Sequence, residues 1–304
     1  MPAFLDALQS GVVPLDGGLG THLEARGNSV ASALWSARIL LEQPDEVHAA
    51  HLDFFQSGSR VATTGSYQVS ASALASAGFD PGLAPELLAR SVELAREARS
   101  AAGLGPGEAW VAASLGPYGA SLGDGSEYTG AYGLSVAELR EWHRPRIAAL
   151  VAARPDVVFA ETIPSLAEAA AIAAETVELN LPVVLSVTVA GGALRSGEAL
   201  AGLVALAERH PGIVALGVNC SSVDETDAAL RVLAAHTELP LIAYPNSGEV
   251  WDARSRSWSG SGRSIVGSVD EWRALGVRAI GGCCRVGTDE VARLSRRITV
   301  EAAG

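Results

Sequence analysis

Near its C-terminal end the sequence reads Val277-Arg278-Ala279-Ile280-Gly281-Gly282-Cys283-Cys284-Arg285, an apolar run followed by two glycines and two adjacent cysteines. The one other cysteine of the 304 residues is Cys220, and it too follows an apolar run, Ile213 to Val218. Short apolar runs next to glycine are typical of buried β-strands. We therefore expect all three thiols to lie at the C-terminal ends of strands.

Three thiolates that meet at one point predict a zinc site. Zinc held by three cysteines keeps one coordination position open for a substrate, as catalytic zinc sites do. The stronger alternative is that the cysteines are simply small buried apolar side chains. A disulfide is the weaker one, because the odd number of cysteines and the lack of a signal peptide argue against an oxidised scaffold. Spacing alone weighs zinc and buried thiols equally, and the rest of the chain favours zinc.

Eight apolar runs that read as buried strands recur along the chain, with helical stretches between them. They cover residues 12–15, 60–64, 110–114, 156–160, 182–188, 213–218, 239–243 and 277–280. This α/β alternation, without a long linker, predicts a single (β/α)8 TIM-type barrel over residues 1–304, with the active site at the C-terminal ends of the strands. Strands six and eight of such a barrel contribute to the same interior layer, so the cysteines that follow them can meet over its mouth.

Four of the helices are predicted to begin with a capping box, in which a serine and a glutamate three residues later satisfy each other's backbone N–H groups. The pairs are Ser135/Glu138, Ser165/Glu168, Ser222/Glu225 and Ser268/Glu271. Pro145 lies inside the helix after the third strand, and we expect it to kink this helix or to split it in two.

The composition excludes several classes of function. A formal net charge of −12 and a pI near 5.0 argue against a nucleic-acid partner or an anionic membrane surface. The N-terminus has no basic region before an apolar run, and no segment reaches about twenty uninterrupted apolar residues, so we expect a cytoplasmic protein. All 22 residues counted as lysine or arginine are arginines. A reaction through a lysine Schiff base is therefore ruled out.

Polar and aromatic residues gather at the predicted C-terminal ends of the strands, where barrel enzymes place their active sites. All five tyrosines of the sequence lie there: Tyr67, Tyr118, Tyr128, Tyr132 and Tyr244. Other strands end in Asp16, Glu161 and Asn219. Two long loops rich in glycine and serine, residues 116–133 and 244–262, are predicted to be lids or walls of a substrate pocket.

The arrangement of these motifs resembles the zinc-dependent homocysteine S-methyltransferase family over nearly the whole chain. The most specific motifs are Gly217-Val218-Asn219-Cys220 and Gly281-Gly282-Cys283-Cys284-Arg285. Asp16-Gly17-Gly18-Leu19-Gly20-Thr21 and Glu161-Thr162-Ile163-Pro164 also match. The segments Gly125-Ser126-Glu127-Tyr128 and Tyr244-Pro245-Asn246-Ser247-Gly248-Glu249 resemble the branch that uses S-methylmethionine or S-adenosylmethionine.

The resemblance implies a zinc ion held by Cys220, Cys283 and Cys284, with the homocysteine thiol in the open position. Asp16 and Glu161 would hold the homocysteine ammonium, and Glu161 is also a candidate catalytic residue. Donors to the homocysteine carboxylate would come from Gly17, Gly18 and Thr21, and Asn219 would order the turn that carries zinc. Tyr67, Tyr244 and Asn246 are further candidates for contact with substrates.

The implied methyl donor is a sulfonium ion, a cation that suits an acidic and aromatic pocket. Glu127, Tyr128 and Tyr132 are the candidates for that pocket, through charge and cation–π contact. The expected activity is methyl transfer to homocysteine to form methionine, with only small molecules as partners. Two alternatives remain open: another thiol or selenol acceptor such as selenocysteine, and a non-catalytic zinc-binding barrel.

Overall fold

The computed structural model of this chain describes residues 4–28, 35–252, 257–260 and 262–302, and its centre is one sheet of eight parallel strands. The order of the strands is β1-β12-β9-β8-β5-β4-β3-β2. Their bounds are β1 Val13–Pro14, β2 Val61–Thr63, β3 Trp110–Leu115, β4 Val157–Ile163, β5 Val183–Val187, β8 Ile213–Asn219, β9 Leu241–Tyr244 and β12 Val277–Ile280. Each overlaps one of the eight predicted runs.

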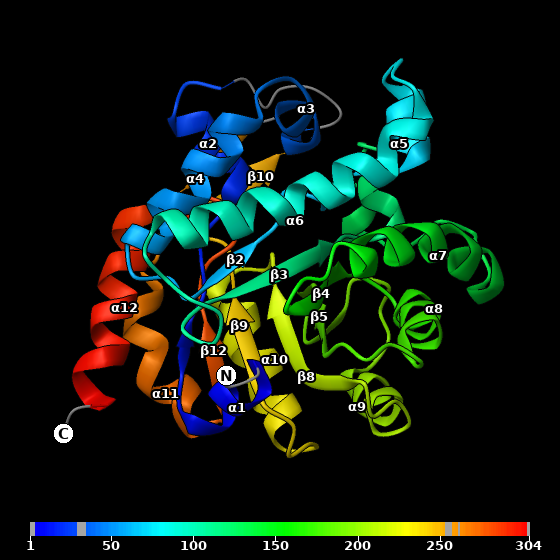
Figure 1. The fold of residues 1–304 in the computed structure, drawn as a ribbon. Coiled ribbons are helices and arrows are strands. Elements are labelled where there is room, and N and C mark those ends of the chain that lie inside the picture. Colours follow the sequence, from blue (N-terminus) through cyan, green and yellow to red (C-terminus); the bar gives the residue numbers. More distant parts are fainter. Residues whose placement is uncertain (1–3, 29–34, 253–256, 261, 303–304) are drawn as a thin grey trace.

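Strands β1 and β2, at the two ends of this order, approach each other and nearly close the sheet into a barrel (Figure 1). The Arg60 amide donates a hydrogen bond of 2.7 Å to the Pro14 carbonyl. At the C-terminal end of the seam, the Asp16 carboxylate accepts hydrogen bonds from the amide and the hydroxyl of Thr63, at 2.6 and 2.9 Å. The predicted (β/α)8 barrel is confirmed.

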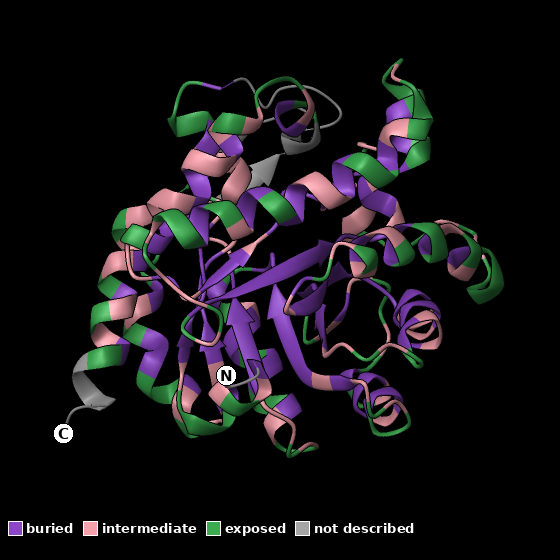
Figure 2. Cartoon of the chain, in the orientation of Figure 1, coloured by how far each residue is buried: buried purple, intermediate pink, exposed green. Residues whose placement is uncertain are grey.

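Helices surround this barrel on its outside, and the strands between them are buried (Figure 2). The helices are α2 Leu19–Ala25, α3 Trp35–Glu42, α4 Pro44–Gln56, α5 Ala71–Ser76, α6 Ala84–Ala101, α7 Val136–Ala152, α8 Leu166–Thr176, α9 Leu200–Glu208, α10 Val223–Ala234, α11 Val269–Ala274 and α12 Thr288–Ala302. Two hairpins add β6 Val189–Ala190 with β7 Ala193–Leu194, and β10 Val250–Asp252 with β11 Ser257–Ser259. None of the described helices is long and apolar enough to cross a bilayer.

The interior of the barrel has its own apolar core, distinct from the layer between strands and helices. Helix α1, Phe4–Ser10, contributes Phe4, whose ring centroid lies 5.9 Å from that of Trp110 and 6.0 Å from that of Phe159. Phe159 in turn lies 6.0 Å from Tyr244, at the end of β9. A continuous stack of rings therefore fills the barrel from α1 up to the floor of its mouth.

The helix starts agree only in part with the predicted capping boxes. Ser135 and Glu138 form the complete box at α7. Ser165 and Ser222 cap α8 and α10, but Glu168 and Glu225 accept hydrogen bonds from Tyr118 and Gly191 instead of completing a box.

The prediction for Ser268/Glu271 is wrong, because a 3-10 turn, Ile265–Ser268, precedes α11 and leaves Ser268 in helical geometry without a cap hydrogen bond. The alternative that Pro145 splits its helix is also wrong. Helix α7 runs through it, from Val136 to Ala152.

The parallel register brings the ends of β8, β9 and β12 to one level. Asn219 of β8 is opposite Tyr244 of β9, and Ala243 of β9 is opposite Ile280 of β12. Beyond these pairs, the Cys220 amide donates to the Tyr244 carbonyl at 3.4 Å, and the Cys283 amide donates to the Pro245 carbonyl at 2.8 Å. The end of β9 thus holds the two cysteine-bearing turns on either side of it.

Candidate active site and metal centre

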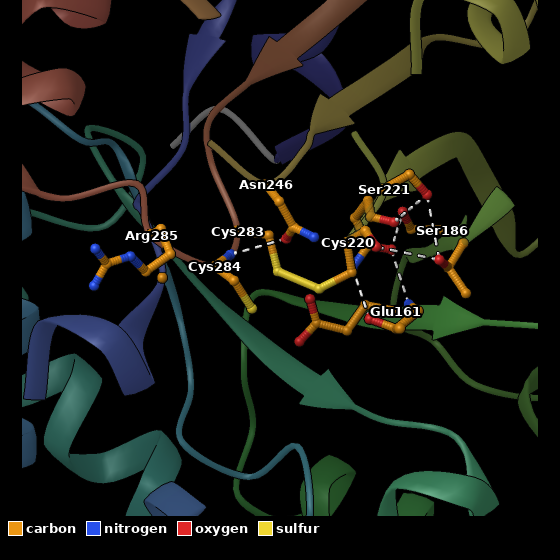
Figure 3. The surroundings of a disulfide bond; sticks show 12 residues. Glu161, Ser186, Cys220, Ser221, Asn246, Cys283, Cys284 and Arg285 are labelled. Carbon is orange, nitrogen blue, oxygen red and sulfur yellow. Dashed lines mark hydrogen bonds between the residues drawn. A yellow bond between two sulfur atoms is a disulfide. The ribbon is translucent and has the colours of Figure 1, made fainter. Parts of the chain in front are cut away.

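The three cysteines come together at the mouth of the barrel, as the sequence predicts. The Sγ atoms of Cys220, Cys283 and Cys284 all lie within 4.8 Å of one another (Figure 3). Cys220 is buried, and the other two are half-buried and line the same pocket. Zinc binds cysteine sulfur at about 2.3 Å, so sulfurs around one tetrahedral ion lie somewhat under 4 Å apart, a spacing that only three separate thiolates can adopt.

Cys220 and Cys283 are joined as a disulfide in this structure, and Cys284 is a free thiol (Figure 3). The sequence left a disulfide open as the weaker alternative, because the number of cysteines and the expected compartment argued against it, and neither of these measures distance. The Cα atoms of Cys220 and Cys283 are 5.6 Å apart, which lies inside the range that a disulfide needs. The fold thus places the two sulfurs where they can either bond each other or share a metal ion.

The turns that carry these groups have unusual backbone geometry. Four described residues other than glycine have a left-handed φ, and three of them lie at the site: Thr162 at 60°, Cys220 at 47° and Arg285 at 65°. Each such residue costs about 1–3 kcal/mol, and such strain collects at functional sites where the surrounding structure enforces it. The strained residues include or directly follow Glu161, Cys220 and Cys284, so they set the directions of those side chains.

Asn219 helps to hold these strained turns in place through hydrogen bonds of its side chain. It is completely buried, and its side-chain oxygen accepts hydrogen bonds of 2.8 Å from the Thr162 amide and 2.9 Å from the Ser186 hydroxyl. Its side-chain nitrogen donates to the Thr162 hydroxyl at 2.8 Å. Asn219 therefore links the turn after Glu161 to the turn that contains Cys220, and its position is that of a support for the site.

Two acidic side chains lie next to the cysteines without a cationic partner among the described residues. Asp16 bonds to Thr63 across the barrel seam, and Glu161 accepts a hydrogen bond from the Ser114 hydroxyl. Burial raises the pKa of Asp16 to about 8, with the nearby Glu161 charge adding to the rise, and burial raises the pKa of Glu161 to about 7. A cation that entered here would restore both carboxylates to their ionised form, so this part of the pocket is built for a positively charged group.

The glycines after β1 allow the loop to lie directly against the cysteine turn. A Cβ atom on Gly17 would stand 2.2 Å from the Val286 carbonyl oxygen, and one on Gly18 would stand 2.5 Å from that of Cys283. The Gly18 amide already donates to the Val286 carbonyl at 3.0 Å. The Thr21 hydroxyl donates to the Gly18 carbonyl at 2.9 Å. The Gly17 amide, one of the three predicted carboxylate donors, has no acceptor among the described residues.

Comparison with known proteins decides the family. Residues 13–298 match the family model described as homocysteine S-methyltransferase. The homocysteine S-methyltransferase of Escherichia coli is 42% identical over 294 residues, covering 94% of this chain and 95% of the relative. Homocysteine S-methyltransferase YbgG of Bacillus subtilis is 37% identical, covering 93% of each chain.

This chain belongs to the homocysteine S-methyltransferase family. The E. coli homocysteine methyltransferase MmuM has been solved in a metallated form, which superimposes with a TM-score of 0.84 at 38% identity and covers 94% of this chain and 96% of that one. Its oxidized form gives the same TM-score and coverage at 39% identity. In the present family member, the group formed by Cys220, Cys283 and Cys284 can hold a metal ion.

The remaining predicted contacts to substrates divide into two sets in this enzyme. Tyr67, Glu127, Tyr128 and Tyr244 line the pocket together with the three cysteines. Tyr132 instead packs behind the pocket, with its ring 5.3 Å from that of Tyr118. Asn246 lies outside the pocket lining and accepts a hydrogen bond of 3.2 Å from the Cys284 amide, so it holds the cysteine turn.

Glu127 is one of three pocket side chains, with Gln68 and Tyr244, that have a buried polar atom without a hydrogen-bond partner among the described residues. Its Oε2 atom is buried and has no hydrogen-bond partner among the described residues. Burial raises the pKa of its carboxyl to about 7. A buried acceptor without a donor costs about 1–3 kcal/mol. The pocket lining therefore contains a third buried carboxyl, besides Asp16 and Glu161, that a cationic ligand would stabilise.

Among the polar residues that line the pocket, Thr63 and Ser114 were not among the site residues predicted from the sequence. Thr63 and Ser114 hold the carboxylates of Asp16 and Glu161 by hydrogen bonds. The available signal was weak but present, since each is a hydroxyl residue at the end of an otherwise apolar strand. Polar atoms at a buried strand end need partners, and here the partners are the site acids.

Proposed function

We propose that this enzyme transfers a methyl group from a sulfonium donor, preferably S-methylmethionine, to the sulfur of homocysteine, forming methionine. Zn²⁺ held by Cys220, Cys283 and Cys284 would stabilise the thiolate form of the incoming thiol at neutral pH. The observation that carries the proposal is the meeting of three thiols with two buried, unpaired carboxyls in one pocket. The protein is proposed to act as one homocysteine-binding domain over residues 1–304, in the cytoplasm.

Homocysteine is proposed to bind with its ammonium between Asp16 and Glu161. The two carboxylates would supply the charge that the ammonium requires, and the ammonium would offset their cost of burial. The substrate carboxylate would lie against the loop of Gly17, Gly18 and Thr21, with the Gly17 amide as a free donor. Holding both the ammonium and the carboxylate of the amino acid fixes the direction of its sulfur. Such positioning of the reacting atom raises the rate of the transfer.

The methyl donor is proposed to lie on the opposite side of the sulfur, against Tyr67, Glu127, Tyr128 and Tyr244. Aromatic faces and a carboxylate both attract a sulfonium cation. In the transfer, the bond between the methyl carbon and the donor sulfur breaks, and its electron pair stays on that sulfur. A lone pair of the homocysteine sulfur forms the new bond, and the thiol proton is released to solvent. Because the leaving group is a neutral thioether, no general acid is required.

The proposed metal site requires the reduced protein. Cys220 and Cys283 joined by a disulfide offer no thiolate to a metal ion, so the disulfide form holds at most the sulfur of Cys284. We therefore assign the activity to the reduced form. The experiment is to measure methionine formation from homocysteine and S-methylmethionine before and after reduction, with zinc content determined in parallel. Equal activity in both forms would contradict the proposal.

A second acceptor is favoured by one of the relatives. A selenocysteine Se-methyltransferase of Brassica oleracea is 34% identical over 308 residues, covering 95% of this chain. Selenocysteine shares the ammonium and carboxylate of homocysteine but has a shorter side chain. Turnover of both acceptors with one donor would decide between them. A non-catalytic zinc-binding barrel is disfavoured, because a structural zinc site does not need two buried carboxyls beside the thiols that have no cationic partner among the described residues.

A further inference from the structure

The hairpin that follows β5 brings a cation to the edge of the cysteine pocket. Arg195 comes directly after β7, and its guanidinium carbon lies 5.5 Å from the centre of the Tyr128 ring. Its Nε donates to the Thr188 hydroxyl at 3.4 Å, and that hydroxyl donates to the Cys220 carbonyl at 3.3 Å. Arg195 is therefore one hydroxyl group away from the backbone of a proposed metal ligand.

Arg195 has no carboxylate partner among the described residues. It is half-buried, and its described contacts are the Tyr128 ring and Thr188. The planar guanidinium is suited to bind a carboxylate through two parallel hydrogen bonds. A half-buried guanidinium left with only a ring and one hydroxyl has most of its donors available to a ligand.

Opposite charges therefore lie close to Tyr128. Glu127 is the preceding residue, and its buried Oε2 atom has no partner among the described residues, while the guanidinium carbon of Arg195 lies 5.5 Å from the centre of the Tyr128 ring. An α-amino acid presents the complementary pair, an ammonium and a carboxylate attached to one carbon. This arrangement distinguishes an amino-acid cation from a simple one, because a simple sulfonium would engage Glu127 and the rings but not Arg195.

We propose that Arg195 binds the α-carboxylate of the methyl donor and selects sulfonium ions that are amino acids. This inference rests on the proposed function, and it adds the class of donor. Homocysteine is not the expected ligand of Arg195, because its carboxylate is assigned to the loop after β1. In the eight-stranded order, β1 is four strands away from β5 in either direction, on the opposite side of the barrel.

The test compares S-methylmethionine with its α-carboxamide, which has nearly the same size and lacks the negative charge. Methionine formed from isotope-labelled homocysteine is measured in the reduced, zinc-loaded enzyme. For the unaltered protein, we expect kcat/KM to be about tenfold or more lower with the carboxamide, as for the loss of a charged hydrogen bond. Arg195→Met should lower kcat/KM for S-methylmethionine by a similar factor. The kcat/KM for the carboxamide should change by less than about twofold.

The controls separate recognition from a general loss of structure. Arg195→Lys keeps the positive charge but lacks the planar guanidinium that forms two parallel hydrogen bonds. Its kcat/KM for S-methylmethionine should therefore lie between the values for Arg195→Met and for the unaltered protein. Arg278→Met removes a half-buried arginine of β12 that does not line the cysteine pocket. It should leave kcat/KM for both donors unchanged. The KM for homocysteine, the zinc content and the melting temperature should be the same in the Arg195 variants as in the unaltered protein.

An equal loss with both donors, an increased KM for homocysteine, or no loss at all in Arg195→Met would overturn the inference and leave the proposed function in place. Absence of methionine with every sulfonium donor in the unaltered protein would refute the proposed function itself, and the inference with it. The two failures are thus seen in different measurements.

Discussion

Glu161→Gln is the substitution that tests the assignment of the ammonium site most directly. Glutamine keeps the size of the side chain and an oxygen that can accept from Ser114, whose hydroxyl bonds to Glu161 in this structure. What it removes is one negative charge from a side chain that is only 7% exposed. A hydrogen bond to a charged group is worth about 1.5–3 kcal/mol, so homocysteine affinity should fall by a factor of about 10 to 150.

The dependence on pH gives this prediction a second measurement. Because the pKa of Glu161 is raised to about 7 and that of Asp16 to about 8 without ligand, both carboxyls take up protons as the pH falls through this range. Homocysteine needs them ionised, so its affinity for the unaltered protein should decrease from pH 9 to pH 6. In Glu161→Gln the affinity should be lower throughout and should decrease less steeply, since one titrating group is gone.

The assay is calorimetric titration of homocysteine into the reduced, zinc-loaded protein, with metal analysis on the same samples. Ser114→Ala serves as the matched control, since it removes the hydrogen bond to Glu161 and leaves the charge, and its effect should be the smaller. Unchanged homocysteine affinity in Glu161→Gln would refute the ammonium assignment. Loss of zinc would show instead that Glu161 supports the metal centre.

Three other predictions follow from the same site. The reduced protein should bind close to one zinc ion per chain, and alanine at Cys220, Cys283 or Cys284 should abolish this in metal analysis; a variant that keeps full zinc and full activity would mark its cysteine as a packing residue. The raised pKa of Asp16 means that ligand-free folding loses stability as the pH rises toward 8, because the folded state then holds a proton that the unfolded state releases near 4. The melting temperature of Asp16→Asn should therefore rise relative to the unaltered protein between pH 5 and pH 9, and a constant difference would contradict the buried, protonated state. Among donors, we expect S-methylmethionine to be best, S-adenosylmethionine slower, and betaine and methyltetrahydrofolate inactive; methionine yields at matched concentrations test this order, and efficient use of betaine would disprove it.

The sequence by itself determined the class of fold and which thiols meet at the mouth of the barrel. Parallel strands buried on both faces read as short apolar runs, and the structure places a strand on every one of the eight. Strand ends in a barrel all meet at one mouth, so the positions of Cys220 and Cys283 after strands β8 and β12 were enough to predict that they converge. Local patterns of this kind depend on neighbours along the chain, and for that reason they can be read without coordinates.

Local reasoning failed where the outcome depended on contacts between distant segments. A capping box at Ser268 was expected from four residues alone, but the packed 3-10 turn before α11 fixed another geometry. The disulfide between Cys220 and Cys283 depends on a separation of 5.6 Å between Cα atoms, which no count of cysteines contains.

Only the tertiary structure decided which polar side chains meet around the pocket. The bonds from Asp16 to Thr63, from Asn219 to Thr162 and from Arg195 to Thr188 join different strands or loops, and each depends on the direction in which a side chain leaves its turn. Left-handed residues such as Thr162 reverse that direction locally, against the preference of the residue itself. The barrel imposes these turns through many contacts at once, so no stretch of sequence carries the information alone.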